Sequence, residues 1–266
     1  MAFPVEPPTP QRPAVDLVSG ARLVARARPW TPDPQVALLT ILDPRPVALA
    51  VDVPTWLARL ADEGYRRVHT SAISPAAATV FERYGFAVVQ ELVVLGLGPV
   101  ALSRWADHRA ERPWRVRTLR WRTDALRPRR EVKRALEIDR EAFGDRWCLD
   151  LHGWRDAVHA TSDRRVTVVE HDNDLAGFAI TGTQSDDAFL QRVAVAPHLH
   201  RRGVARALVD DAIGWVARGR RRQVFVNTAH DNTAALGLYQ SMGFQRRPAG
   251  LVVLEGTTQG GSEVGR

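Results

Sequence analysis

The sequence predicts an α/β protein in which helices flank a mixed central sheet, with a partial module followed by a complete one. Two observations carry this prediction. Residues 189–244 read as strand, loop, helix, strand and helix in succession, and a shorter block that ends at Phe86 repeats the last part of that pattern. Strands that alternate with helices favour a sheet covered by helices. The 266 residues are enough for two such modules.

Composition and the repeat divide the chain into five expected segments. Proline is frequent among the first residues, and Gly, Ser, Thr and Gln are frequent among the last ones, so both ends are expected to be flexible. A polar stretch between the modules is expected to be a linker. The segments are a flexible start at 1–14, a partial module at 15–100, a linker at 101–113, a complete module at 114–255 and a flexible tail at 256–266.

Apolar spacing predicts the elements of each module. In the partial module we expect strands over 21–51, a helix at 53–63, a strand at 66–71, a helix at 75–84 and a strand at 86–97. In the complete module we expect a strand at 114–120, helices at 131–142 and 150–160, strands at 164–170, 175–183 and 188–195, and a helix at 204–217 that Gly219 ends. Residues 171–174 read as a hairpin turn.

A basic turn stands between the last of these strands and the helix that begins at Val204. A helix that starts directly after a turn points unpaired backbone N–H groups, and the positive end of its dipole, at whatever occupies the turn. Gly203 would let the backbone approach a phosphate, and Arg201, Arg202 and Arg206 would add charge-assisted hydrogen bonds. The turn is therefore predicted to bind an anion, although an ordinary loop glycine beside a solvated helix start would give the same pattern.

The same block resembles the CoA-binding core of the GNAT superfamily of N-acetyltransferases. That family carries a pyrophosphate loop written Q/R-x-x-G-x-G/A, followed by N-x-x-A-x-x-x-Y-x-x-x-G-F. The second motif is matched in full by Asn232, Ala235, Tyr239, Gly243 and Phe244. The first motif departs from the pattern at His200, where Gln or Arg is usual, but histidine can still donate a hydrogen bond to a phosphate. The resemblance covers about residues 114–255.

The resemblance implies the GNAT fold, acetyl-CoA as co-substrate, and pantetheine held between the strands at 189–195 and 223–227. The residues that it implies for cofactor binding are Val193, Ala194, Val195, His200, Arg201, Arg202, Gly203, Val204, Ala205, Arg206, Asn232 and Ala235. Asn232 and Tyr239 are seven residues apart and share a helix face. Asn232 is also a good helix N-cap, and a core aromatic is the alternative interpretation of Tyr239.

Acyl transfer from a thioester to an amine needs a neutral amine and a proton for the departing thiolate. A tyrosine with a pKa near 10 is a suitable proton donor at pH 7, and Tyr239 is the candidate. Many members of the family carry a glutamate base where this chain has Gln191, which cannot accept a proton. Neutralising a lysine amine at pH 7 costs roughly 4 to 5 kcal/mol, whereas an α-amine costs about 1 kcal/mol. The site therefore suits a weakly basic amine, unless Glu170, His171 or Asp187 reaches it through water.

The repeat indicates that the first module has lost this chemistry. A Gly-Phe pair that ends each copy fixes an offset of 158 residues, which places Ser74 with Asn232 and Phe81 with Tyr239. No basic loop with glycine precedes the helix at 53–63, and phenylalanine has no proton to donate. We therefore expect a tandem GNAT protein whose degenerate N-terminal module holds structure or substrate without catalysing.

Charge alone does not define a partner. The net charge of +7 and the pI of 10.7 would usually suggest an acidic partner such as nucleic acid, but Lys133 is the only lysine among the 37 basic residues. This ratio indicates a bias toward arginine. No nucleic-acid reader motif is present, so nucleic-acid binding is not expected, and binding through residues 112–134 would show as a steep salt dependence.

Other classes of protein and site are not expected either. The single cysteine, Cys148, excludes an internal disulfide, and its apolar context favours a buried structural thiol over a nucleophile. The first residues lack a signal-peptide pattern and no apolar run reaches membrane-spanning length, so a cytoplasmic protein is expected. His198 and His200 form a loop-borne pair without a metal-ligand pattern, and no metal is expected.

The expected function is acetyl-CoA-dependent transfer of an acetyl group to an amine, on a peptide, a protein α-amine or a small molecule. The alternative is a catalytically weak acyl-CoA-binding or protein-interaction module, which Gln191 and His200 favour. The acceptor, the acyl chain length, the general base and the oligomeric state stay open.

Overall fold

The computed structural model describes residues 13–19, 21–42, 46–106, 114–119, 130–219 and 221–259. The chain divides into two compact units. Unit 1 consists of Met1–Leu92 with Ala249–Arg266, and unit 2 consists of Val93–Pro248.

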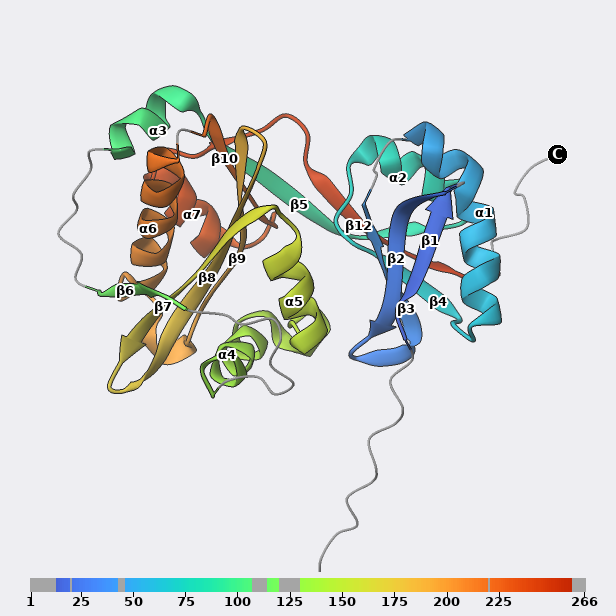
Figure 1. Cartoon of the computed structure of the whole chain (residues 1–266), viewed down its shortest axis with the longest axis horizontal. Coiled ribbons are helices and arrows are strands. Elements are labelled where there is room, and N and C mark those ends of the chain that lie inside the picture. Colours follow the sequence, from blue (N-terminus) through green and yellow to red (C-terminus); the bar gives the residue numbers. More distant parts are fainter. Residues whose placement is uncertain are drawn as a thin grey trace, which may run out of the picture. The chain divides into compact units, whose positions relative to one another are not determined.

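Unit 1 is a sheet with two helices. Its elements are β1 (Val15–Ser19), β2 (Arg22–Trp30), β3 (Asp33–Ile41), α1 (Pro46–Asp62), β4 (Arg67–Thr70), α2 (Pro75–Glu82), the first part of β5 (Ala87–Leu97) and β12 (Leu251–Thr257). The strand order is β1-β2-β3-β4-β12-β5, in which β3 and β4 run parallel and the other neighbours antiparallel (Figure 1). Trp56 and Leu60 of α1 and Phe81 of α2 share one buried cluster with Leu39 and Leu254 of the sheet.

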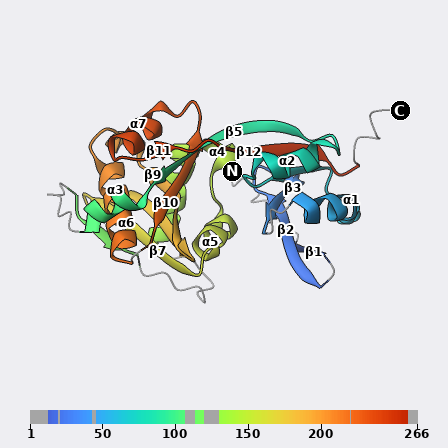
Figure 2. The same cartoon turned by 90° about the horizontal axis from the view of Figure 1, so that it is seen from above.

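Unit 2 is a sheet covered by helices on both faces. Its elements are the end of β5, α3 (Pro99–Ala106), β6 (Val116–Thr118), α4 (Arg130–Trp147), α5 (Leu151–His159), β7 (Asp163–His171), β8 (Asp174–Gln184), β9 (Asp187–Val195), the short helix η1 (Pro197–Leu199), α6 (Val204–Arg218), β10 (Gln223–Ala229), α7 (Thr233–Ser241) and β11 (Gln245–Arg246). The strand order is β5-β10-β9-β8-β7-β6, and β11 pairs with β5. Figures 1 and 2 show α6 and α7 on one side of β7 to β10, with α4 and α5 on the other.

The predicted fold class is confirmed. The structure is a mixed sheet flanked by helices, and the strands and helices expected between residues 131 and 217 lie within a few residues of β7, β8, β9, α4, α5 and α6. The hairpin turn between β7 and β8 has positive φ at Asp172 (51°) and Asn173 (63°), as a tight turn of this kind requires.

Three sequence-based boundaries are wrong. Residues 46–51, expected in a strand, are helical because α1 begins at Pro46, and proline is favoured in the first turn of a helix. Residues 101–106 of the expected linker belong to α3, whose Leu102 is buried; residues 107–113 lie outside the described residues. The expected tail at 256–266 begins too early, since β12 runs to Thr257 and the Thr258 hydroxyl donates to the Tyr65 carbonyl at 2.8 Å.

The compact units also differ from the predicted modules at their ends. Unit 2 begins at Val93 because Leu95 and Leu97 are buried in its core. Strand β12, expected in the second module, belongs to unit 1 because it pairs with β4 and with the first part of β5. The apolar pattern identifies these strands but does not say which sheet each one joins.

Candidate functional site

Strand β9 carries a β-bulge at Gln191. Its register with β8 pairs Arg192 with Ile180 and Leu190 with Thr181, which leaves Gln191 without a partner in β8. One extra residue inverts the face that each later side chain takes. Leu190 is therefore buried in the cluster of α6 and α7, whereas the Arg192 side chain reaches α4 on the opposite face.

Beyond the bulge, one backbone edge of β9 is open. The parallel pairing of β9 with β10 ends at Leu190. The N–H of Ala196 donates to β8 at 2.9 Å, and because backbone groups alternate along a strand, those of Ala194 also face β8. The backbone groups of Val193 and Val195 therefore face away from β8, and we call these two residues the open edge. Ala194, expected beside them as a cofactor contact, does not direct its backbone to this edge.

Unit 1 has the same pair of strands with the edge closed. β3 and β4 stay parallel through Leu39 and Thr70, and the register of β2 with β3 is unbroken from Ala37 to Ile41. Ser71 extends the pairing: its N–H donates to the Leu39 carbonyl at 2.7 Å, and its hydroxyl accepts from the Ile41 N–H at 3.2 Å. Without a bulge, β3 offers no edge to a ligand there.

The turn before α6 has the geometry of an anion site. Gly203, the N-cap residue of α6, has a φ of 86°, and Arg201 has a φ of 60°. Within the described part of the chain, the N–H groups of Gly203, Val204, Ala205 and Arg206 have no hydrogen-bond acceptor. These donors and the positive end of the helix dipole suit a phosphate group.

Trp114 holds this turn in place. Its indole N–H donates to the Arg202 carbonyl at 2.7 Å, and its ring lies edge-on to His171 with 5.3 Å between ring centroids. A Cβ added at Gly203 would meet only Trp114 atoms, at 3.8 and 4.0 Å. Glycine is therefore required here by the backbone angle and not by a lack of space.

Two of the expected phosphate ligands already have partners within the protein. The His200 Nε2–H donates to the Val195 carbonyl at 3.0 Å, because a carbonyl can only accept. The neutral ring then has no second N–H, so the expectation that His200 donates to a phosphate is wrong for that form. Arg206 donates to the Ser241 hydroxyl at 3.1 Å but keeps further N–H donors, and Arg201 and Arg202 are exposed.

Asn232 caps helix α7, as its type and position predict. Its side-chain oxygen accepts from the Ala235 N–H at 3.1 Å, and its amide NH₂ group keeps donors for a ligand. In unit 1 the Ser74 hydroxyl accepts from the Ala77 N–H at 3.3 Å and caps α2 in the same way. The two caps make a matched pair.

Replacing each cap with alanine separates capping from ligand binding. Asn232→Ala and Ser74→Ala should each lower the free energy of unfolding by about 1 kcal/mol. Only Asn232→Ala should also weaken binding of the expected co-substrate, acetyl-CoA, by about threefold to tenfold, which is the usual effect of one lost hydrogen bond. Denaturant unfolding and calorimetric titration measure the two effects. Equal CoA affinities in both variants would mean that Asn232 acts only as a helix cap.

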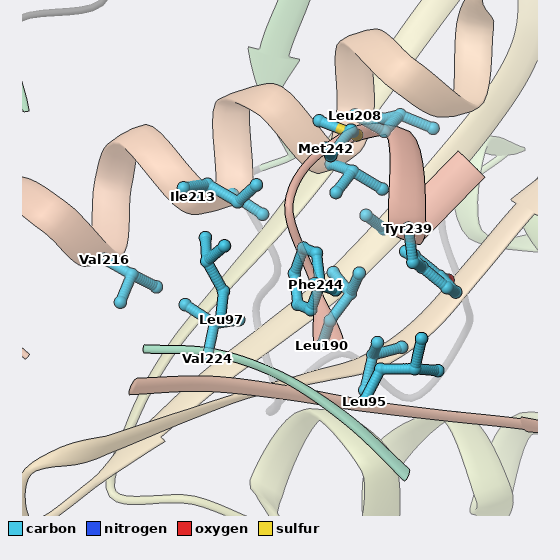
Figure 3. Packing of buried hydrophobic residues seen from close by; sticks show 14 of the residues in the cluster. Leu95, Leu97, Leu190, Leu208, Ile213, Val216, Val224, Tyr239, Met242 and Phe244 are labelled. Atoms are coloured by element: carbon cyan, nitrogen blue, oxygen red, sulfur yellow. The ribbon is translucent and has the colours of Figure 1, made fainter. Parts of the chain in front are cut away.

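Tyr239 lies within the packed core of unit 2. Its side chain is 6% exposed, and its ring lies 5.6 Å from that of Phe244, close to Met242 in the same cluster (Figure 3). Burial raises the pKa of Tyr239 well above its usual range. The hydroxyl is therefore protonated at neutral pH, as a proton donor must be, but it is a weaker acid than a free tyrosine.

The structure brings none of the three acidic or basic alternatives next to Gln191. Glu170 binds Arg117, which lowers the pKa of that carboxyl, and strand β8 separates its strand from β9. His171 packs against Trp114. Asp187 is four residues before Gln191 on β9, about 13 Å along the strand. The amide of Gln191 remains the polar group at the bulge, and its buried Oε1 has no hydrogen-bond partner within the described residues.

The basic stretch at 112–134 is partly neutralised by acidic neighbours. Arg117 binds Glu131 and Glu170, and Arg134 binds Asp174 at 2.9 Å. Residues 112–113 and 120–129 lie outside the described residues. Arg117 and Arg134 therefore serve internal ion pairs.

Cys148 is half-buried, and its thiol lies 3.5 Å from the Asp145 carbonyl. In the described ranges, no group of three or more His, Cys, Asp or Glu side chains is placed to hold a metal ion. No helix in those ranges is both long enough and apolar enough to cross a membrane.

Sequence reasoning missed the bulge, the bond from Trp114 and the partners of Arg192. The bulge leaves little trace in the sequence: residues 188–190 and 193–195 are all apolar, so the strand shows no alternation whose phase could change. Trp114 and Arg192 contact residues far away in the chain, and no local pattern identifies such contacts.

The sequence around this site is similar to a known family of proteins. Residues 123–244 match the sequence model of the Acetyltransferase (GNAT) family. The [Ribosomal protein bS18]-alanine N-acetyltransferase of Escherichia coli strain K12 is 36% identical over 70 residues, which cover 26% of this chain and 47% of that enzyme. The enzyme of that name from Salmonella typhimurium strain LT2 is 36% identical over 73 residues, covering 27% and 49%. The chain thus spans about half the length of the curated relatives it matches.

Solved structures extend the likeness over most of the chain. A tandem GNAT protein from the clavulanic acid biosynthesis pathway aligns with a TM-score of 0.57 and 14% identity, covering 92% of this chain and 82% of that one. An acetyltransferase of the GNAT family from Novosphingobium aromaticivorans aligns with a TM-score of 0.55 and 17% identity, covering 91% of both chains. At such identities the likeness concerns the fold. Residues 123–244 therefore match the Acetyltransferase (GNAT) family model, in a chain that shares its fold with a tandem GNAT protein.

Proposed function

We propose that the chain is an acetyl-CoA-dependent N-acetyltransferase in which unit 2 transfers the acetyl group directly from the CoA thioester to an amine. The family match and the curated relatives support acyl transfer in general. The acetyl donor and the amine acceptor are the finer part of the proposal. A peptide or protein α-amine is the favoured acceptor, and a peptide with N-terminal alanine is the first to test because the relatives are named for that residue.

The observation that carries the proposal is that the open edge and the anion turn belong to one connected segment. The bond from His200 to the Val195 carbonyl ties the turn to the end of β9. The two amides of pantetheine can pair with Val193 and Val195 while the pyrophosphate accepts from the N–H groups at the start of α6. In unit 1 the corresponding edge is closed by Ser71, so the proposal assigns one cofactor site to the chain.

The proposed reaction is a single displacement at the thioester carbonyl. The neutral amine nitrogen attacks the carbonyl carbon, the new C–N bond forms, and the C–S bond breaks as CoA leaves. The amine loses one proton and the thiolate gains one. Tyr239 donates the proton to sulfur and is reprotonated by the proton that the amine releases, so its protonation state is unchanged over the cycle.

The amide at Gln191 explains why a weakly basic acceptor is favoured, and it gives a test. Gln191→Glu places a carboxylate at the bulge, where it can accept the proton of a more basic amine. We expect kcat/KM for a lysine side-chain amine, on a peptide with a blocked N-terminus, to rise about tenfold or more at pH 7. For a peptide α-amine with blocked lysines, the change should stay within about threefold, because roughly a tenth of that amine is already neutral at pH 7.

The control for this variant is Gln191→Met, which fills similar volume without a base. It should not improve the reaction of either peptide. Equal losses on both peptides in Gln191→Glu would contradict the assignment of this position to acceptor basicity.

A catalytically weak acyl-CoA-binding module is the second candidate function. The raised pKa of Tyr239 and the amide at Gln191 favour it, since neither group is a strong acid or base. Incubating the wild type with acetyl-CoA and the alanine peptide, followed by mass measurement of the peptide, separates the candidates. A gain of one acetyl group at the N-terminus supports the enzyme, whereas CoA binding without acetylation of the peptide or of a panel of amines supports the binding module.

A further inference from the structure

One arginine ties the strand of the open edge to the connection between helices α4 and α5. Arg192 lies on β9 directly after the bulge, and its guanidinium binds both oxygens of Asp139 on α4, at 2.7 and 2.8 Å. It also donates to the carbonyl of Trp147, the last residue of α4, at 2.7 Å. Its Cζ lies 3.4 Å from the centre of the Phe143 ring.

The carboxylate at the centre of this arrangement is fully buried. Asp139 is 0% exposed, and besides the guanidinium it accepts from the Leu149 N–H at 2.6 Å. The ion pair thus contacts the segment from 139 to 149 at four residues, which are Asp139, Phe143, Trp147 and Leu149. Within that segment Gly144, with a φ of 71°, breaks the helix, so the chain there is not held by regular helical hydrogen bonds alone. We call residues 143–149 the α4–α5 connection.

The place of the α4–α5 connection follows from the bulge. Because Gln191 inverts the alternation of β9, Arg192 points to the face that α4 covers, and the next residue, Val193, returns to the open edge. The side chain that fixes the connection, Arg192, therefore lies one residue before Val193, where the open edge would hold the thioester. An acceptor amine that reaches the thioester from this face of β9 has to pass the α4–α5 connection.

We propose that Arg192 and Asp139 are positioning residues that hold the α4–α5 connection as a wall of the acceptor pocket. The half-exposed Phe143 and Trp147 provide the apolar surface of that wall. The ion pair fixes where the acceptor binds relative to the thioester, and it contributes nothing to the binding of CoA. This inference rests on the proposed function of unit 2.

A purely structural role makes a different prediction. A buried ion pair adds little to stability compared with well-packed apolar residues of similar volume, although removing one partner alone is strongly destabilising. Stability therefore does not require this particular pair. A fork with two parallel hydrogen bonds gives geometric precision that a lysine or an apolar pair cannot give.

The test compares three variants with the wild type. Arg192→Lys keeps the charge and loses the fork, and Arg192→Met with Asp139→Leu removes both charges without leaving either one unpaired. The matched control is Arg165→Met with Asp211→Leu, which removes the pair between half-buried Arg165 on β7 and buried Asp211 on α6, whose atoms lie 3.0 Å apart. For each protein we would measure the affinity for acetyl-CoA, the KM for the alanine peptide, and hydrogen exchange of residues 143–149.

We expect both Arg192 variants to raise the KM for the peptide about tenfold or more and to speed exchange in the α4–α5 connection. Their affinity for acetyl-CoA should stay within about twofold of the wild type. The control pair should leave both constants within about twofold. A folded Arg192→Met, Asp139→Leu variant with the wild-type KM and exchange would overturn the inference, as would a parallel loss of CoA affinity.

Measurements on the wild type separate a failure of this inference from a failure of the proposed function. If the wild type binds acetyl-CoA but acetylates no amine, the proposed function fails. Hydrogen exchange still reports in that case whether Arg192 holds the connection, so unchanged exchange in the variants overturns the positioning role on its own.

Discussion

Gly203→Glu should weaken acetyl-CoA binding by about a hundredfold or more. The substitution forces a residue with a Cβ into a φ of 86° and places a carboxylate among the N–H groups that are proposed to hold the pyrophosphate. Backbone strain of this kind costs about 1–2 kcal/mol, and like charges in contact cost several kcal/mol more. Since each 1.4 kcal/mol is about a factor of ten in affinity, the charge term dominates the expected loss.

The control for Gly203→Glu is Gly203→Ala. Both variants carry the same strained backbone, and an added Cβ meets nothing closer than 3.8 Å, so both should lose similar stability. Gly203→Ala should bind acetyl-CoA with a much smaller loss than Gly203→Glu. Equal losses in the two variants would mean that strain, and not an anion site, accounts for the effect.

Tyr239→Phe should lower turnover about tenfold or more while affinity for acetyl-CoA is unchanged. Unit 1 shows that phenylalanine fits this environment: Phe81, at the matching place of the repeat, is fully buried, and its ring lies 5.3 Å from Phe86, much as Tyr239 lies 5.6 Å from Phe244. The variant should therefore fold normally. Steady-state kinetics with the alanine peptide and a calorimetric titration measure the two constants.

The pH dependence of the wild type tests the same residue. Burial raises the pKa of Tyr239, so its hydroxyl stays protonated up to and beyond the usual tyrosine pKa of about 10. The value of kcat/KM should rise with pH as the α-amine deprotonates near about pH 8, and it should then stay level up to about pH 10. A fall between pH 8 and 10 would contradict the assignment of Tyr239 as a buried proton donor, and so would a Tyr239→Phe variant with wild-type turnover.

Local patterns predict most of the elements of this chain. Apolar periodicity locates the strands and helices of unit 2, and the cap at Asn232 follows from residue type and position alone. The matching of Ser74 and Asn232 comes from the repeat, and the structure shows both as helix caps. Such features depend on neighbours within one turn of helix or along one strand, which is why the sequence reveals them.

Tertiary features are what the sequence conceals. The role of His200 changes because its ring reaches the Val195 carbonyl, and Ala194 faces β8 because of a hydrogen-bond alternation that only the register defines. Strand β12 has an ordinary strand pattern, yet only pairing reveals which unit it completes. The open edge itself depends on one inserted residue, Gln191, which changes the pairing of the sheet without a clear pattern in the sequence.

The two units differ at the edge of their paired parallel strands. Ser71 closes the edge of β3 with two hydrogen bonds, whereas the bulge at Gln191 leaves Val193 and Val195 unpaired by β10. The repeated architecture therefore predicts one acetyl-CoA site per chain, in unit 2. Two functional copies would give two sites, and a fold without function would give none.

Calorimetric titration of the purified chain with acetyl-CoA tests this claim most directly, with Gly203→Glu titrated beside it. We predict one molecule bound per chain, with the heat of binding lost in the variant. Two molecules per chain, one molecule still bound by Gly203→Glu, or no binding by the wild type would contradict it.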